Sequence, residues 1–134
     1  MRALALTALA VAVVVLPGCQ SEPFRTIGAD FKRAFGSKSN GDAALAAGIK
    51  DYEAGRYADA SKQLRAAIGQ GLGRADEVRA HKYLAFIHCI AERIASCREE
   101  FRRALRIDPG MELTPAEAGH PSWGPVFRAV KAGR

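Results

Sequence analysis

Residues 52–68 read YEAGRYADASKQLRAAI, and their order of small and apolar residues returns 37 positions later in CIAERIASCREEFRRAL, residues 89–105. A small residue in each copy would let two helix backbones approach closely, and a larger apolar residue one turn later would fill the gap beyond it. An alanine near the end of each copy would keep the two helices of the hairpin closely packed where the second helix ends. The matched pairs are Ala60 with Cys97, Leu64 with Phe101, and Ala67 with Ala104. The repeat therefore predicts two copies of one helical hairpin.

Glycine and proline mark where the predicted helices turn and end. Gly55 permits a tight turn inside the first copy, whereas the second copy has no glycine at its turn, and Pro109 ends the last helix of the repeat. Because no stretch alternates apolar and polar residues as a strand would, we expect an all-α fold. The helices are expected at residues 41–54, 57–69, 75–90, 94–107 and 121–131.

The C-terminal segment is expected to cover the last hairpin. An array of only two hairpins leaves its outer faces open, and such faces need a cap. Trp123, Val126, Phe127 and Val130 form an apolar stripe in a segment whose prolines lie where helices would begin. We expect a capping helix with Trp123 in the core, and a Trp123 that faces a partner is the alternative.

The N-terminus carries an export signal. Arg2 precedes an apolar run, Ala3 to Leu16, which is too short to span a bilayer as a mature helix. The run ends in Leu16-Pro-Gly-Cys19, which resembles the bacterial lipobox. The resemblance implies that residues 1–18 are a lipoprotein signal peptide and that Cys19 is lipidated with diacylglycerol and a fatty acyl chain such as palmitate. Several acyl chains make a membrane anchor effectively permanent. An ordinary signal peptide that happens to carry a cysteine is the alternative.

Residues 19–40 are expected to be a lipid-anchored tether. Gln20 and Ser21 follow the cysteine where lipoproteins of the inner membrane usually have an acidic residue, so the resemblance implies the outer membrane, with the domain facing the periplasm. Within the tether, four apolar residues recur at spacings of three and four and so share one face of a short helix. They are Phe24, Ile27, Phe31 and Phe35. This face could lie in the membrane interface, dock on the protein's own helices, or stay disordered.

The chain is basic, with 20 Lys and Arg against 14 Asp and Glu, a formal net charge of +6. Removing the signal peptide takes away Arg2 and leaves +5. An exported lipoprotein rarely meets nucleic acid, so we expect no nucleic-acid partner. Anionic lipid headgroups or an acidic protein surface are the expected partners for this charge.

Two cysteines remain after Cys19. Cys89 and Cys97 lie four residues on either side of Arg93, which places them at equal height on facing helices. In an oxidising compartment we expect a disulfide there, worth on the order of 2–3 kcal/mol at most because its loop is small. Two reduced, buried thiols are the alternative.

Chemistry-bearing motifs are missing from the sequence. His81 and His88 are seven residues apart, and no Cys or His pair has a recognised ligand spacing, so we expect no metal site. There is no paired carboxylate set, nucleophile with a base, or phosphate-binding loop. We therefore expect a protein that is not an enzyme and has no cofactor and no small-molecule substrate.

The repeat resembles the tetratricopeptide repeat, whose period is 34 residues. The resemblance implies that residues 41–134 form a tetratricopeptide-like pair of antiparallel hairpins with a C-terminal capping helix. The cysteine pair, together with His120-Pro-Ser-Trp-Gly-Pro125, is similar to the short tetratricopeptide lipoproteins associated with type VI secretion clusters (the TssQ/TagM type). The resemblance covers Cys19 and about residues 45–131. It implies an accessory outer-membrane lipoprotein that helps to assemble or position an envelope-spanning secretion machine. A pilus or outer-membrane assembly lipoprotein and a structural cell-envelope lipoprotein are the alternatives.

In tetratricopeptide domains the first helix of each hairpin lines the concave face, which places a partner-binding stripe on two helices. The predicted residues are Leu45, Ile49 and Tyr52, then Arg79, Lys82, Phe86 and Ile90. An apolar stripe edged by cations suits an amphipathic helix or an acidic and hydrophobic peptide. The alternative is that the tether or the C-terminal helix covers the stripe.

Overall fold

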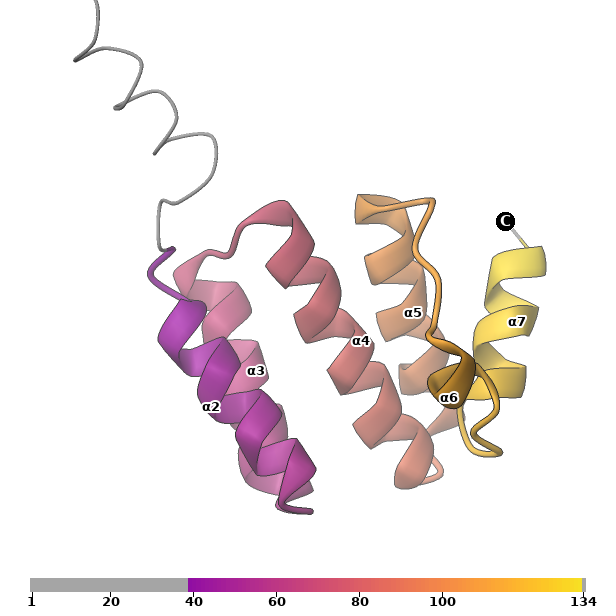
Figure 1. The fold of residues 1–134 in the computed structure, drawn as a ribbon, viewed down its shortest axis with the longest axis horizontal. Coiled ribbons are helices and arrows are strands. Elements are labelled where there is room, and N and C mark those ends of the chain that lie inside the picture. Colours follow the sequence, from indigo (N-terminus) through magenta and orange to yellow (C-terminus); the bar gives the residue numbers. More distant parts are fainter. Residues whose placement is uncertain (1–38, 134) are drawn as a thin grey trace, which may run out of the picture. The chain divides into compact units, whose positions relative to one another are not determined.

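The computed structural model describes residues 39–133, which form six helices and, within that range, no strand (Figure 1). The helices are α2 (Asp42–Glu53), α3 (Tyr57–Gln70), α4 (Arg74–Ile90), α5 (Ile94–Ile107), α6 (Pro115–Ala118) and α7 (Gly124–Ala132). The all-α prediction is confirmed, and the five expected helices agree with the structure to within three residues at each end. The short helix α6 was not expected. The predicted signal peptide, the lipidated Cys19 and nearly all of the tether lie outside the described residues.

The described helices pack as two successive hairpins. In Figure 1, α2 lies beside α3 and α4 beside α5, and α3 contacts α4 to join the two hairpins. The first hairpin needs a glycine at its closest approach, because a Cβ on Gly48 would lie 2.8 Å from Leu64 Cγ. Ala85 holds the matching position of the second hairpin and is fully buried. Two small residues 37 positions apart, Gly48 and Ala85, therefore hold matching buried places in the two hairpins.

The two hairpin turns have the same backbone. The Arg56 N–H donates to the Asp51 carbonyl at 2.8 Å, and 37 residues later the Arg93 N–H donates to the His88 carbonyl at 2.9 Å. Arg56 has φ −85° and ψ 65°, and Arg93 has φ −83° and ψ 66°. Both turns also contain one residue in the left-handed region. That residue is Gly55 in the first turn, at φ 75°, and Glu92 in the second, at φ 57°.

The C-terminal segment completes the core of the second hairpin. Trp123, Phe127 and Val130 are buried in one apolar cluster with Phe101 of α5, as the capping interpretation expected, and Val126 is partly buried against it. Helix α6 begins with a capping box, in which the Glu117 N–H donates to Thr114 Oγ1 and the Glu117 carboxylate accepts from the Thr114 N–H. Within residues 39–133 no helix combines the length and the apolar character needed to cross a membrane.

Candidate protein-binding surface

A row of aromatic rings runs from the first hairpin across α4 to the segment before α7. The ring centroids of Tyr57 and Tyr52 are 5.7 Å apart, and those of Tyr52 and Tyr83 are 5.0 Å apart. The row continues from Tyr83 to Phe86 at 5.9 Å and from Phe86 to Trp123 at 4.3 Å. Edge-to-face and offset contacts of this kind add about 0.5–1.5 kcal/mol each beyond the area they bury. The row therefore fixes α2, α4 and the C-terminal segment against one another.

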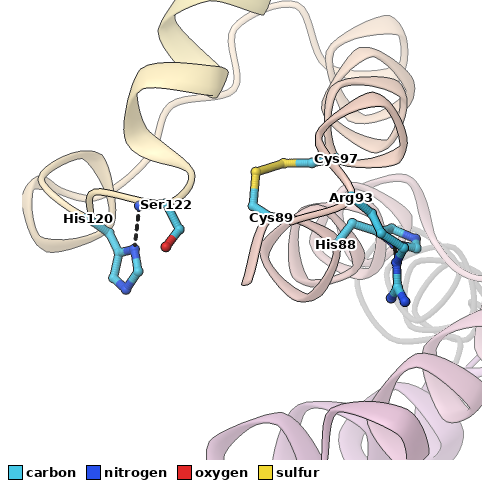
Figure 2. The surroundings of a disulfide bond; sticks show 6 residues. All are labelled: His88, Cys89, Arg93, Cys97, His120 and Ser122. Atoms are coloured by element: carbon cyan, nitrogen blue, oxygen red, sulfur yellow. Dashed lines mark hydrogen bonds between the residues drawn. A yellow bond between two sulfur atoms is a disulfide. The ribbon is translucent and has the colours of Figure 1, made fainter. Parts of the chain in front are cut away.

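One end of this row is closed by the C-terminal segment. Phe86 is only 2% exposed, because Trp123 stacks on it with the two ring planes 23° apart. Trp123 also stacks on His120, with the two ring centroids 3.4 Å apart. Figure 2 shows that the His120 ring accepts a hydrogen bond from the Ser122 N–H. The Trp123 indole N–H has no hydrogen-bond partner in the described part of the chain. Phe86 is thus a core residue here.

An ion pair crosses the boundary between α4 and α6. Lys82 Nζ donates to the Glu117 carboxylate at 2.7 Å and lies 5.4 Å from the centre of the Tyr83 ring. Burial opposes the ionised form of Glu117, but the hydrogen bonds from Lys82 and from the Thr114 backbone outweigh it and lower the pKa of the carboxyl. The pair leaves a partly buried cation and anion at the edge of the aromatic row.

The other end of the row is partly open and carries hydroxyl groups. Burial, followed by repulsion from the Tyr57 and Tyr83 side chains, raises the pKa of Tyr52 to about 12. Burial, followed by Glu117, also raises the pKa of Tyr83. Both phenols therefore stay protonated at neutral pH and can each donate a hydrogen bond. A half-buried aromatic surface with two donors suits a partner that presents apolar side chains and backbone carbonyls.

The structure divides the seven predicted partner-binding residues into two groups. Leu45 and Phe86 are buried in the core, at 4% and 2% exposure. The other five are partly or fully exposed, and Arg79 forms an ion pair with Asp76 at 2.9 Å. They are Ile49, Tyr52, Arg79, Lys82 and Ile90.

Sequence reasoning missed two members of this surface, Tyr83 and Glu117. A signal for Tyr83 was available, since it lies four residues after Arg79 and three before Phe86 and so shares their helix face. Glu117 was not predictable from spacing, because it belongs to α6, which is brought to α4 by tertiary packing.

The expected disulfide is present. Cys89 at the end of α4 and Cys97 in the first turn of α5 are bonded at 2.08 Å, and both are buried (Figure 2). The alternative of two reduced thiols is not what the structure contains. In residues 39–133 no three His, Cys, Asp or Glu side chains gather as ligands for a metal ion.

Comparisons with protein-family models, with curated proteins and with solved structures find no match to this chain.

Proposed function

We propose that this chain is an outer-membrane lipoprotein, anchored through Cys19, that acts in the periplasm as a protein–protein adaptor accessory to a type VI secretion system. The lipobox-like sequence that ends at Cys19 supports the anchor and the export. The disulfide supports an oxidising compartment, because such bonds persist outside the cytosol.

The adaptor would be a tetratricopeptide-like domain of two hairpins and a cap. Matched burial supports this finer assignment, because the repeat pairs Leu64 with Phe101 and Ala60 with Cys97 are all fully buried. The matched hydrogen bonds of the two turns support it as well. A period of 37 residues and the lack of a turn glycine in the second copy are departures from the usual repeat.

The observation that best supports a binding role is the partly exposed aromatic surface on α2 and α4. Tyr52 and Tyr83 contact each other there, with Ile49 and Arg79 on the same helices. The best-supported partner is a protein segment that offers apolar anchors and backbone acceptors, and a basic residue at the edge favours acidic groups in it.

A photo-crosslinking amino acid placed at Ile49 in the native host tests the proposal. Ile49 is partly exposed and lies three residues before Tyr52 on α2, whereas the control position, Lys62, is exposed on α3. We expect type VI baseplate or membrane-complex subunits to crosslink at Ile49 and not at Lys62. Pilus components would support the assembly alternative instead, and only porins or peptidoglycan would support a structural envelope role.

The anchor has its own test. Cys19→Ala should abolish incorporation of labelled palmitate and release or mislocalise the protein, while the circular dichroism of the helical domain stays unchanged. Palmitate labelling that persists in Cys19→Ala would refute lipidation at this residue.

A further inference from the structure

An open pocket of about 350 Å³ lies among α3, α4 and α5, away from the aromatic row. Its polar lining comes from all three helices: Arg65, His81, His88, Ser96, Glu99, Glu100 and Arg103. His88 and Arg93 extend away from the disulfide in Figure 2. None of the functional predictions from the sequence used this pocket.

His88 is the unusual group in this lining. Only 5% of the residue is exposed, and Arg93 Nε donates to its Nδ1 at 3.0 Å. A neutral imidazole has one acceptor nitrogen and one N–H, so with Nδ1 accepting, Nε2 carries the hydrogen. Nε2 lies 3.4 Å from Arg65 Nη2, which is also a donor. The reverse tautomer would place an N–H against Arg93 at the shorter distance, so it is the less favourable one.

The two donors therefore face each other, and within residues 39–133 neither of these two nitrogens has a hydrogen bond to an acceptor. The carboxylates of the lining are engaged elsewhere: Glu100 accepts from His81 Nδ1 at 2.7 Å, and Glu99 accepts from Arg103 and Arg106. A buried donor that lacks an acceptor is destabilising, and more so beside a charged group. A hydrogen-bond acceptor that enters the pocket could therefore accept from both donors.

We propose that this pocket binds a carboxylate group of a partner protein, with an oxygen accepting from both His88 Nε2 and Arg65 Nη2. A monoanion fits better than a phosphate dianion, because Glu99 and Glu100 stand in the same wall and would repel a second negative charge. The inference goes beyond the proposed secretion role, since it depends only on the donors of this pocket. The carboxylate can come from an Asp or Glu side chain or from a chain terminus.

Binding should be coupled to protonation of His88. Burial, then Arg93 and Arg65, lower the pKa of His88, against an opposing contribution from Glu100. Arg65 faces the ring from α3, Arg93 from the turn between α4 and α5, and Glu100 from α5. A carboxylate bound at Nε2 adds a negative charge and raises that pKa, so binding favours protonation of the ring at Nδ1, where the proton replaces the hydrogen bond from Arg93. The affinity for the carboxylate should therefore increase as the pH is lowered through the pKa that His88 has in the complex.

The test uses the full-length lipoprotein in detergent micelles with nitrogen-15 in its histidine rings. Sodium acetate is titrated at constant ionic strength against chloride, and the His88 ring signal is assigned with His88→Gln. We expect a saturable shift of Nε2 that tightens at lower pH. Arg65→Gln should weaken binding at least about tenfold, because it removes a charged donor, and Arg65→Lys should weaken it less. Lys62→Gln, on the same helix but outside the pocket, should bind as the wild type does.

Two peptides distinguish the sources of the carboxylate. One is acetyl-Ala-Glu-Ala-amide, with only a side-chain carboxylate, and the other is acetyl-Ala-Ala-Ala, with only a terminal one. Saturable binding of either supports the proposal and identifies the source. A shift that never saturates, or one that is identical in Arg65→Gln and in the wild type, would overturn it. Tighter binding of inorganic phosphate than of acetate would also overturn it.

Discussion

The turns between α2 and α3 and between α4 and α5 make the same backbone hydrogen bonds, but only the second of these two turns is also bridged by a disulfide, Cys89–Cys97. The first turn has Gly55 in the left-handed region, where glycine has no steric cost. The second has Glu92 there, and an ordinary residue in that region costs about 1–2 kcal/mol. One backbone is therefore reached by two kinds of sequence, one through conformational freedom and the other through a covalent link.

The surroundings of the two turns differ as well. In the first, the half-exposed Arg56 side chain reaches back five residues to the Asp51 carboxylate, and in the second Arg93 reaches back five residues to the buried ring of His88. The second hairpin also receives the C-terminal segment against Phe101. We infer that the second hairpin contributes more to the stability of the fold than the first.

The largest effect is expected from truncating the matched large residues. Phe101→Ala should lower the free energy of unfolding by about 3–5 kcal/mol, and Leu64→Ala by about 2–5 kcal/mol. Phe101 should cost more, because its ring contacts both Phe86 at 6.1 Å and Phe127 at 5.2 Å. Urea unfolding followed by circular dichroism measures both variants.

Fluorescence of Trp123, the single tryptophan, reports on the core of the second hairpin in the same experiment, because Trp123 is buried in one cluster with Phe101. Phe101→Ala should shift the Trp123 transition more than Leu64→Ala does. A greater loss of stability in Leu64→Ala would contradict the inference that the second hairpin is the stronger.

Reduction of the disulfide should cost about 2.5 kcal/mol of unfolding free energy, the loop-closure value for cysteines eight residues apart. Dithiothreitol should therefore lower the urea midpoint of the wild type. The double variant Cys89→Ala, Cys97→Ala is the control and should not respond to the reductant. An unchanged midpoint in the reduced wild type would show that the hydrogen bonds alone hold the second turn.

Exchanging the left-handed residues should act in opposite directions. Gly55→Ala should destabilise the protein by about 1–2 kcal/mol, although a Cβ there would meet no atom within 4 Å, because the cost is conformational. Glu92→Gly should stabilise it by about 0.5–1 kcal/mol, since the relief of the backbone exceeds the added freedom of the unfolded chain. Destabilisation by Glu92→Gly would mean that the disulfide already removes the cost of this conformation.

The buried ring in the second turn should make stability depend on pH. Burial and then Arg93 lower the pKa of His88, so below about pH 6.5 the unfolded chain binds more protons than the folded one. Stability should therefore fall as the pH decreases from 7 to 5. His88→Gln should reduce this slope in urea unfolding at several pH values. An equal slope in the variant would assign the dependence to other groups.

Much of the fold was predictable because it depends on local spacing. The small residues of the repeat predicted where helices approach, and Gly55 predicted the tight turn of the first hairpin, whereas the left-handed Glu92 in the second turn was not predicted. The candidate surface was predictable only in part. That Trp123 covers Phe86 depends on packing between segments 37 residues apart, and the meeting of Arg65 with His88 depends on the contact of two hairpins. The Thr114–Glu117 capping box could have predicted α6 from the sequence, although α6 is too short to show a helical periodicity.

The smallest effect is expected from the arginines of the two turns. Arg56 donates to the Asp51 carboxylate at 2.5 Å, but about half of its side chain is exposed, so Arg56→Ala should cost only about 0.2–1 kcal/mol. That cost should disappear in 0.5 M salt, because exposed pairs are screened. Arg93→Ala removes the donor to a buried nitrogen and should cost more, with little dependence on salt. Since Arg93 is one cause of the lowered pKa of His88, Arg93→Ala should also flatten the pH dependence of stability. Equal costs with equal salt dependence would show that the two turns, despite their different residues, are held by the backbone alone.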